Sequence, residues 1–169
     1  MIMTNISDVK KTNYKKMKNV QDSKTEQVYV VCPKDINPQS KLSGGRLIQW
    51  IDELGGIVGR RHSGKMITTA KIDNIDFIAG AQQNDMIVLI GKVTYVGNTS
   101  MEVRVDTYIE DYNGNRKNIN TAYLVMVALD ENGNPAKVPE LQIKSELEKK
   151  EWLNGQNRYN MRKQRKVTN

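Results

Sequence analysis

The strongest constraint on the fold is an amphipathic helix pattern at residues 44–62, followed by strand patterns alone as far as residue 129. Within it, Leu47, Ile51, Leu54 and Val58 recur at intervals of four, three and four residues, which places them on one face of a helix. A helix with one apolar face must bury that face against another layer. The rest of the chain therefore has to supply a sheet that covers this helix.

Strand patterns before and after the helix predict such a sheet. Alternating and β-branched apolar residues, bounded by Pro, Gly and Asn turns, predict strands at 27–31, 67–77, 86–96, 99–111 and 118–129. We expect the last four to form an antiparallel meander with one buried face. The predicted fold class is α+β, with the sheet wrapped around one long helix. Its open edge is expected to pair with a second subunit.

Charge divides the chain into a core and two tails. Residues 1–24 are rich in lysine, and residues 157–169 contain five Arg and Lys residues without an acid. Because the tails hold most of the net charge of +7, the core is close to neutral, which argues against nucleic-acid binding. We predict a flexible basic lead at 1–24, one domain at 25–143, and a polar helix with a basic tail at 144–169.

The sequence also indicates the compartment. It contains no run of 18 apolar residues, so we expect no membrane span, and its first residues lack the pattern of a signal peptide. The lone cysteine, Cys32, cannot form a disulfide framework and is interpreted as a structural thiol. A cytoplasmic protein is the expectation.

A partial phosphate-binding motif at residues 59–66 is rejected. Met66 stands where the motif needs a hydroxyl for magnesium, and the segment closes a helix instead of opening one. Gly64 is better explained as the glycine that ends the helix. His62 lies in the last turn, and we do not expect it to be the catalytic base.

One flank of the predicted helix holds a single carboxylate among residues with almost no side chain. Asp52 shares this flank with Ile48 and with four glycines, Gly45, Gly55, Gly56 and Gly59. Each interior glycine costs the helix roughly 1 kcal/mol relative to alanine. Two interpretations stay open. Either a ligand or another chain approaches the backbone beside Asp52, or the glycines allow tight helix–sheet packing beside an exposed aspartate.

A Gly-Gly pair opens the helix. The first N–H groups of a helix are unpaired, and glycine lets an oxygen approach them, so Gly44 and Gly45 could stabilise an oxyanion. A simple glycine turn into the helix explains the pair equally well.

Three blocks together resemble a known family: GGRLIQWIDELGGIVGRRHSGKMITTAKIDNIDF, VTYVGNTSMEVRV and TAYLVMVALDENGNPAKVPEL. In this order they resemble the acyl-CoA thioesterases of the hotdog superfamily, in particular the cytosolic acyl-CoA hydrolases. The resemblance covers residues 28–162. It implies a hotdog fold paired with a second hotdog subunit, assembled as a trimer of dimers.

The resemblance also assigns site residues. It implies that Asp52 is catalytic, and that Asn37 is the second active-site residue, acting from the neighbouring subunit across the dimer interface. Family members usually have glycine at the position of Ser40, and an aromatic residue or histidine at that of Ser43. These departures leave open the conformation of the loop between Asn37 and the helix.

The expected chemistry is hydrolysis of the thioester of medium- to long-chain fatty acyl-CoA. Asp52 would act as general base on water or attack directly, and the sequence leaves both routes open. Asn37 would orient the water or bind the carbonyl, and Gly45, with Gly44, would bind the oxyanion. We expect no cofactor and no metal, because one histidine and one cysteine do not make a site.

The CoA part is expected to lie along residues 69–77 and the loop 97–100. The candidate contacts for it are Gly44, Asn74, Phe77, Gly97, Thr99, Ser100, Arg60 and Arg61, with Arg104 as a further cation for the 3′-phosphate. A hairpin turn with ordinary surface charges is the alternative interpretation of this region.

Two other functions occur on the same fold. A regulatory hotdog module would bind acyl-CoA without turnover, but such modules usually carry a DNA-binding segment, and residues ahead of Val28 show no helix-turn-helix pattern. A dehydratase would need a histidine near the helix start, whereas His62 lies at the other end. Asp52 as the carboxylate of a thioesterase is the preferred hypothesis.

Overall fold

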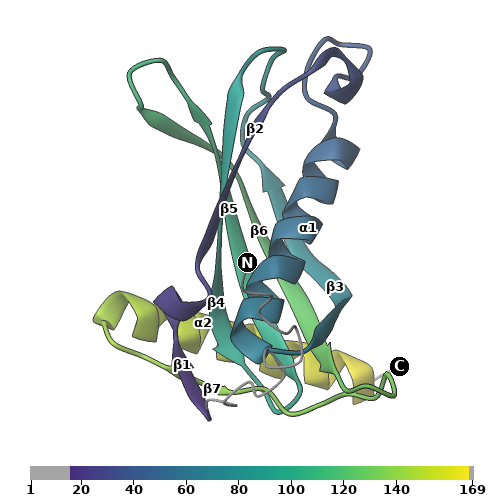
Figure 1. The fold of residues 1–169 in the computed structure, drawn as a ribbon, viewed down its shortest axis with the longest axis vertical. Coiled ribbons are helices and arrows are strands. Elements are labelled where there is room, and N and C mark those ends of the chain that lie inside the picture. Colours follow the sequence, from purple (N-terminus) through teal and green to yellow (C-terminus); the bar gives the residue numbers. More distant parts are fainter. Residues whose placement is uncertain (1–15, 168–169) are drawn as a thin grey trace, which may run out of the picture.

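The computed structural model describes residues 16–167 of the 169-residue chain. This part contains two α-helices, a five-stranded antiparallel sheet and a small two-stranded parallel sheet (Figure 1). The elements in chain order are β1 (Met17–Asn19), the 3-10 turn η2 (Val20–Asp22), β2 (Thr25–Val30), the 3-10 turn η3 (Pro33–Asp35), α1 (Gly44–Ser63), β3 (Met66–Phe77), β4 (Met86–Val96), β5 (Ser100–Glu110), β6 (Arg116–Leu129), β7 (Glu140–Gln142) and α2 (Glu146–Val167).

Helix α1 is the predicted one, and the sheet curves around it as expected for an α+β hotdog fold. The four residues of its apolar stripe are all buried in the core against the inner face of the sheet. The helix ends at Gly64, whose φ of 67° is left-handed and whose N–H donates to the carbonyl of Arg60 at 2.8 Å. The prediction of a helix over 44–62 is confirmed.

The large sheet has the strand order β2-β4-β5-β6-β3, which corrects the predicted meander. Strands β4, β5 and β6 follow one another as predicted, but β3 pairs with β6 at the far edge. The eight residues 78–85 between β3 and β4 are too many for a tight hairpin, so these strands need not be neighbours. Instead β3 returns along α1 directly after the turn at Gly64.

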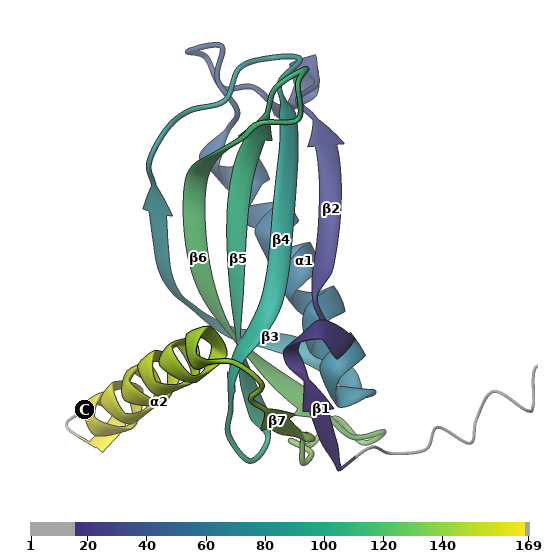
Figure 2. The same ribbon diagram turned by 90° about the vertical axis from the view of Figure 1, so that its left-hand side faces the viewer.

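Helix α2 crosses the outer face of the sheet, opposite α1 (Figure 2). Trp152 and Tyr159 of this helix contact the ring of Tyr95 in β4, at centroid distances of 5.3 and 5.4 Å. The predicted helix in 144–169 therefore exists, but it packs on the domain and is not a detached tail. Neither helix of residues 16–167 is long and apolar enough to cross a membrane.

The predicted flexible lead extends too far along the chain. Residues 1–15 lie outside the described part, but residues 16–24 form β1 and η2, and β1 pairs in parallel with β7. Val20, Ser23 and Leu141 are buried where these short elements meet the body of the protein. Strands of three residues are too short to produce a visible hydrophobic period, so the sequence did not indicate them.

Candidate active site

Asp52 lies on the half-buried flank of α1 that faces β3. Thr69 Oγ1 in β3 donates a hydrogen bond to Asp52 Oδ1 at 2.6 Å, and the same hydroxyl lies 3.4 Å from Met126 Sδ. A hydroxyl has a single proton, and the carboxylate is the nearer and stronger acceptor. The bond fixes one oxygen of Asp52 and leaves the other, Oδ2, to meet a reactant.

The glycines around Asp52 divide between the two interpretations. A methyl group at Gly55 would lie 2.5 Å from Met126 Cε, and one at Gly59 would lie 3.4 Å from Ile67, so these two allow close helix–sheet packing. A methyl group at Gly56 would meet nothing within 4 Å in the described chain. Packing thus explains Gly55 and Gly59, while Gly56 leaves open space in the turn that follows Asp52.

Asn37 begins the tight loop that leads into α1. Its Oδ1 accepts the N–H groups of Gln39 at 2.9 Å and Lys41 at 3.2 Å, and its own N–H donates to the Lys41 carbonyl at 2.7 Å. Because two backbone donors fix Oδ1, the amide nitrogen is directed away from the loop as a hydrogen-bond donor. Ser40 closes this loop with a φ of 58°.

Glycine is favoured at a left-handed backbone angle. The departure noted at Ser40 therefore falls on the residue where the loop requires such an angle.

Three of the predicted residues line one cavity at the start of α1. Asn37, Gly44 and Phe77 border a volume of about 310 Å³ whose other walls are mostly apolar, including Leu47 and Ile119. A methyl group at Gly44 would lie 3.6 Å from the Phe77 ring, while one at Gly45 would meet only Ser43 Oγ at 3.8 Å. Gly45 is exposed, so its backbone stays accessible to an incoming oxygen.

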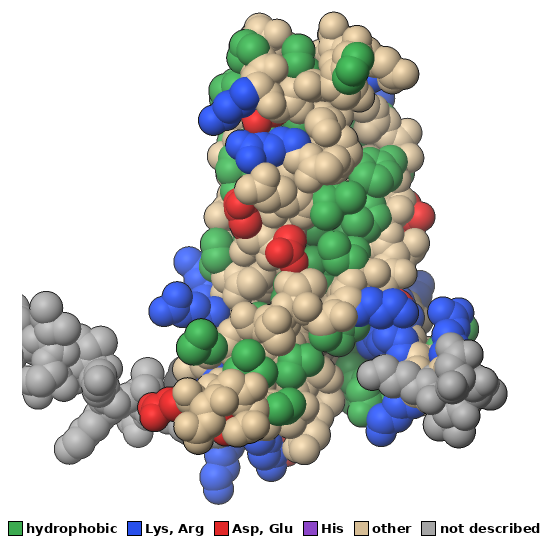
Figure 3. Space-filling model, turned by 90° about the vertical axis from the view of Figure 1, so that its right-hand side faces the viewer, with side chains coloured by type: hydrophobic (Ala, Val, Ile, Leu, Met, Phe, Trp, Pro, Cys, Tyr) green, Lys and Arg blue, Asp and Glu red, His purple; other side chains and the backbone are tan. Residues whose placement is uncertain are grey.

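Asn37 and Asp52 do not meet within one subunit. Asp52 is about two helical turns beyond Gly44 and is not among the residues that line the Asn37 cavity. Strand β3 runs from Thr69, beside Asp52, to Phe77 at the cavity, and it is a sheet edge without a further strand partner in residues 16–167. The face that α1 and β3 present gathers hydrophobic side chains (Figure 3). At the end of β3, Phe77 and Ile78 are 54% and 63% exposed.

The predicted CoA loop lies at a second and larger cavity. Thr99 and Ser100, in the hairpin between β4 and β5, border a volume of about 730 Å³ that basic residues of α2 also line. Gly97 takes no part as a free donor, because its N–H donates to the Ser100 carbonyl at 2.8 Å. A methyl group at Gly97 would lie 3.2 Å from Ser100 Oγ and 3.5 Å from Tyr159, so this glycine allows the turn to pack under α2.

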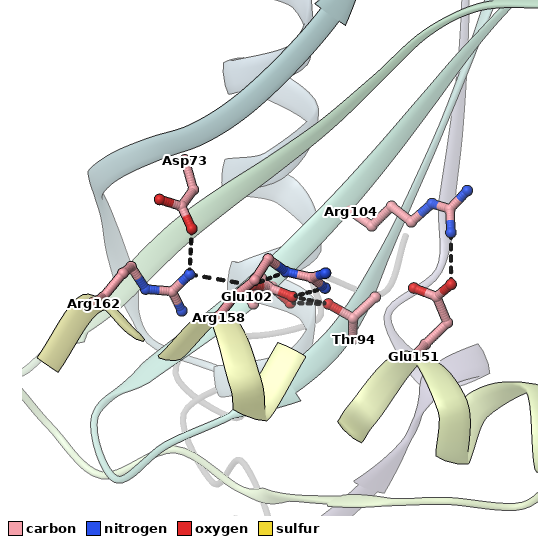
Figure 4. Close-up of polar contacts among 7 residues, drawn as sticks. All are labelled: Asp73, Thr94, Glu102, Arg104, Glu151, Arg158 and Arg162. Atoms are coloured by element: carbon pink, nitrogen blue, oxygen red, sulfur yellow. Dashed lines mark hydrogen bonds and ion pairs between the residues drawn. The ribbon is translucent and has the colours of Figure 1, made fainter. Parts of the chain in front are cut away.

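The arginines chosen from the sequence do not lie at that cavity. Arg61 donates to Thr25 Oγ1 at 2.9 Å at the far end of α1, and Arg60 is exposed beside it. Arg104 pairs with Asp106 at 2.9 Å. It also pairs with Glu151 at 2.7 Å (Figure 4), so carboxylates already neutralise its charge. The assignment of these three to phosphate binding is not supported.

The remaining predicted contact, Asn74, is exposed on β3. Its amide donates to Asp76 Oδ2 at 2.8 Å, and it lines neither of the two cavities.

His62 is buried at the end of α1, far from Asn37. Its Nε2 lies 3.0 Å from the carbonyl of Pro139, and its Nδ1 has no hydrogen-bond partner in the described chain. Burial lowers the pKa of His62, the charge of Lys18 lowers it further, and the Pro139 carbonyl opposes both. This environment holds a neutral structural histidine.

Comparison with known proteins gives a consistent picture. Residues 40–113 match the thioesterase superfamily. The uncharacterized acyl-CoA thioester hydrolase YkhA of Bacillus subtilis is 37% identical over 146 residues, 86% of this chain and 85% of that protein. An acyl-CoA hydrolase of Staphylococcus aureus, solved with butyryl coenzyme A, coenzyme A and coenzyme A disulfide, is 33% identical. It has a TM-score of 0.84 and covers 90% of this chain and 93% of its own.

A hexameric acyl-CoA thioesterase in its apo form is similarly close. It is 34% identical, with a TM-score of 0.85 over 90% of this chain and 99% of its own. Three further structures of the Staphylococcus aureus enzyme carry alanine in place of an asparagine, an aspartate and a threonine. Those residues are 15 and 17 positions apart, which is the spacing of Asn37, Asp52 and Thr69 here.

The sequence analysis missed Thr69. The available indication was its place in a strand beside the helix, on the face that alternation shares with Ile67.

Proposed function

The chain belongs to the hotdog-fold acyl-CoA thioester hydrolases, and we propose that it hydrolyses medium- to long-chain fatty acyl-CoA to the fatty acid and CoA. The observation that supports this most is the bond from Thr69 to Asp52 on an open flank of α1. One oxygen of the carboxylate is held, and Gly56, one turn further along α1, leaves open space on the helix. The shared spacing with the three residues replaced in the Staphylococcus aureus enzyme supports the same assignment.

In the proposed reaction Asp52 acts as the general base. A water molecule transfers a proton to Asp52 Oδ2 while its oxygen attacks the thioester carbonyl carbon. The oxyanion accepts hydrogen bonds from the N–H groups at Gly44 and Gly45, near the positive end of the helix dipole. When the C–S bond breaks, the CoA thiolate takes the proton back from Asp52, which restores the carboxylate.

We place Asn37 of the partner subunit at the same thioester. Its Oδ1 is occupied by two backbone donors, so its amide nitrogen would donate to the carbonyl oxygen or to the attacking water. Because Asn37 and Asp52 lie apart in one subunit, each site would be completed by the second chain.

This arrangement needs a homo-oligomer, at least a dimer. The hexameric acyl-CoA thioesterase that this chain resembles supports a trimer of dimers. The free edge of β3 and the apolar face beside it would be the dimer contact. A cytoplasmic location stays a prediction of the sequence.

The test is release of free thiol from acyl-CoA over a panel of acyl chain lengths. We expect turnover that is highest for medium to long chains, and a loss on the order of 10³-fold in kcat for Asp52→Asn, which keeps the shape of the side chain. Glu53→Gln removes a neighbouring exposed carboxylate and serves as the matched control. Full activity of Asp52→Asn would refute the assignment, and binding without thiol release would favour a regulatory module.

A further inference from the structure

A further cavity lies on the outer face of the sheet, beside the N-terminal half of α2. Its volume of about 510 Å³ falls within the range of small-molecule sites, roughly 300–1,000 Å³. Residues of β4 and β5 line it from the sheet, α2 covers it, and η2 and β7 contribute one residue or two each at its side. It shares no lining residue with the cavities at Asn37 and at Thr99. None of the residues proposed for thioester hydrolysis lines it.

Ion pairs hold α2 over this face of the sheet. Arg104 of β5 donates to Glu151 of α2 at 2.7 Å, at the border of the cavity (Figure 4). Further along the helix, Arg158 donates to the two oxygens of Glu102 at 2.8 and 3.0 Å, and the side chain of Glu102 is fully buried. Because these contacts fix the cavity wall before a ligand arrives, binding loses less conformational entropy.

Asp106 presents one unpaired carboxylate oxygen to the cavity. The residue is only 7% exposed, and it lines the cavity from β5. Its Oδ1 accepts hydrogen bonds from Arg104 at 2.9 and 3.0 Å and from Thr121 at 2.9 Å. Its Oδ2 accepts none from residues 16–167 and is not sealed from solvent. A nearly buried carboxylate oxygen without a donor favours a ligand that brings an N–H or O–H group.

Lys92 supplies the opposite charge on the neighbouring strand. In the register of β4 and β5, Ile90 pairs with Asp106 and Lys92 pairs with Arg104, so Lys92 and Asp106 are diagonal neighbours. Both line the cavity. Lys92 is half-buried, and it forms no ion pair with an acid of the part of the chain that the structure describes. An ammonium group that has lost water without gaining an acid favours an anionic ligand group.

The other charged residues of the cavity are bound by the protein or are exposed. Glu148 accepts the backbone N–H of Lys144 at 2.7 Å, and Glu151 holds the ion pair with β5. Lys24 and Lys150 are exposed. Lys92 and Asp106 Oδ2 are therefore the two charged groups that a ligand inside the cavity meets without displacing a contact of the protein.

We propose that this cavity binds a free α-amino acid with an apolar side chain. The carboxylate of the ligand binds Lys92, and its ammonium group donates to Asp106 Oδ2. Its side chain lies against the apolar part of the wall, formed by Val20, Leu141 and Leu147. An acid alone leaves Asp106 without a donor, and an amine alone leaves Lys92 without an acceptor. The inference does not depend on the proposed function, because the cavity lies apart from the residues assigned to it.

The experiment is calorimetry of the purified protein with L-leucine and three analogues. Isocaproate lacks the ammonium group of leucine, isoamylamine lacks its carboxylate, and glycine lacks its side chain. We expect leucine to bind, and each analogue to bind more weakly by on the order of tenfold or more. In Lys92→Met, leucine should bind no better than isoamylamine, because the partner of the carboxylate is gone. Lys117→Met, at an exposed position of β6, is the matched control and should bind leucine as the wild type does.

Lys92→Met should keep the wild-type unfolding temperature and rate of thiol release from octanoyl-CoA, so a loss of leucine binding reports on the cavity and not on misfolding. Absence of leucine binding to the wild type would overturn the proposal. Leucine binding that survives Lys92→Met would place the ligand elsewhere and overturn it too. Isocaproate bound as tightly as leucine would show a site for anions and contradict the role of Asp106.

Discussion

Thr69 Oγ1 donates a 2.6 Å hydrogen bond to Asp52 Oδ1 and so joins the edge strand β3 to the flank of the central helix. The two residues are 17 positions apart in the chain, and each comes from an element whose place depends on the whole sheet. The bond gives the carboxylate one oriented oxygen and one available oxygen, and it makes Thr69 a positioning residue for the proposed base.

Replacing Thr69 tests this relationship. Thr69→Val keeps the shape and removes the hydroxyl, so we expect kcat for acyl-CoA hydrolysis to fall roughly 10- to 100-fold with little change in KM. Thr69→Ser should recover most of the rate, because it returns the donor. Thr68→Val, next along the strand and exposed, is the control. If the role of Thr69 were purely structural, Thr69→Val would lose stability and Thr69→Ser would not restore kcat.

The left-handed angle at Ser40 predicts a stabilising substitution. A left-handed backbone costs a residue with a Cβ about 1–2 kcal/mol, and glycine avoids this cost. Ser40→Gly should therefore raise the free energy of unfolding by about 1 kcal/mol and Tm by about 2–4 °C in a protein of this size. Ser43 has an ordinary φ of −64°, so Ser43→Gly should give no such gain. A lower Tm for Ser40→Gly would contradict the prediction.

The buried His62 predicts a pH-dependent stability. Burial lowers the pKa of His62 below its ordinary value of 6.5, so between these two pKa values the unfolded chain binds a proton that the folded chain resists. Protonation of His62 in the unfolded chain therefore lowers the free energy of unfolding as the pH falls below about 6.5. Above that pH His62 has no such effect.

Denaturant unfolding measured between about pH 7.5 and about pH 5.5 tests the role of His62. We expect His62→Gln, which does not titrate, to show a flatter loss of unfolding free energy over this interval, whatever its absolute stability. Equal slopes for the variant and the wild type would assign the pH dependence to other groups.

The close contacts at Gly155 show that α2 packs tightly on the sheet. A methyl group there would lie 2.6 Å from Tyr95 Cβ and 2.9 Å from Glu102 Oε1, so Gly155→Ala must shift the helix from the sheet. We expect it to lower the free energy of unfolding by about 1–3 kcal/mol. Asn154→Ala, at the exposed neighbouring position, adds no contact of this kind. If both variants unfold alike in denaturant, α2 is less firmly packed than the ion pairs of Glu102 indicate.

Much of the fold could be predicted because its pattern is local. The stripe from Leu47 to Val58 and the alternation in the long strands depend on neighbours within a few residues, and the structure places these elements within about two residues of their expected ends. The pairing of β3 with β6 could not be predicted, since residues 78–85 allow several routes. Strands β1 and β7 are too short to show a period.

Part of the candidate site could be predicted because its residues belong to a short sequence pattern shared with a known family. The family pattern drew attention to Asp52 and Asn37, and the cavity at the start of α1 collects Asn37, Gly44 and Phe77. The pattern gave no indication that Gly55 and Gly59 serve packing, because that depends on where Met126 and Ile67 lie.

By itself, the sequence determined the helix, the long strands and the glycine-lined flank around Asp52, because local periodicity and residue size encode them. Only the tertiary structure decided which charges remain available. Arg104 looks like any surface arginine in the sequence, yet Asp106 and Glu151 neutralise it. Lys163 looks like part of a solvated tail, yet Glu102 fixes its helix over a hollow beside β3. Charge is a property of the residue, but its availability depends on neighbours that only folding brings together.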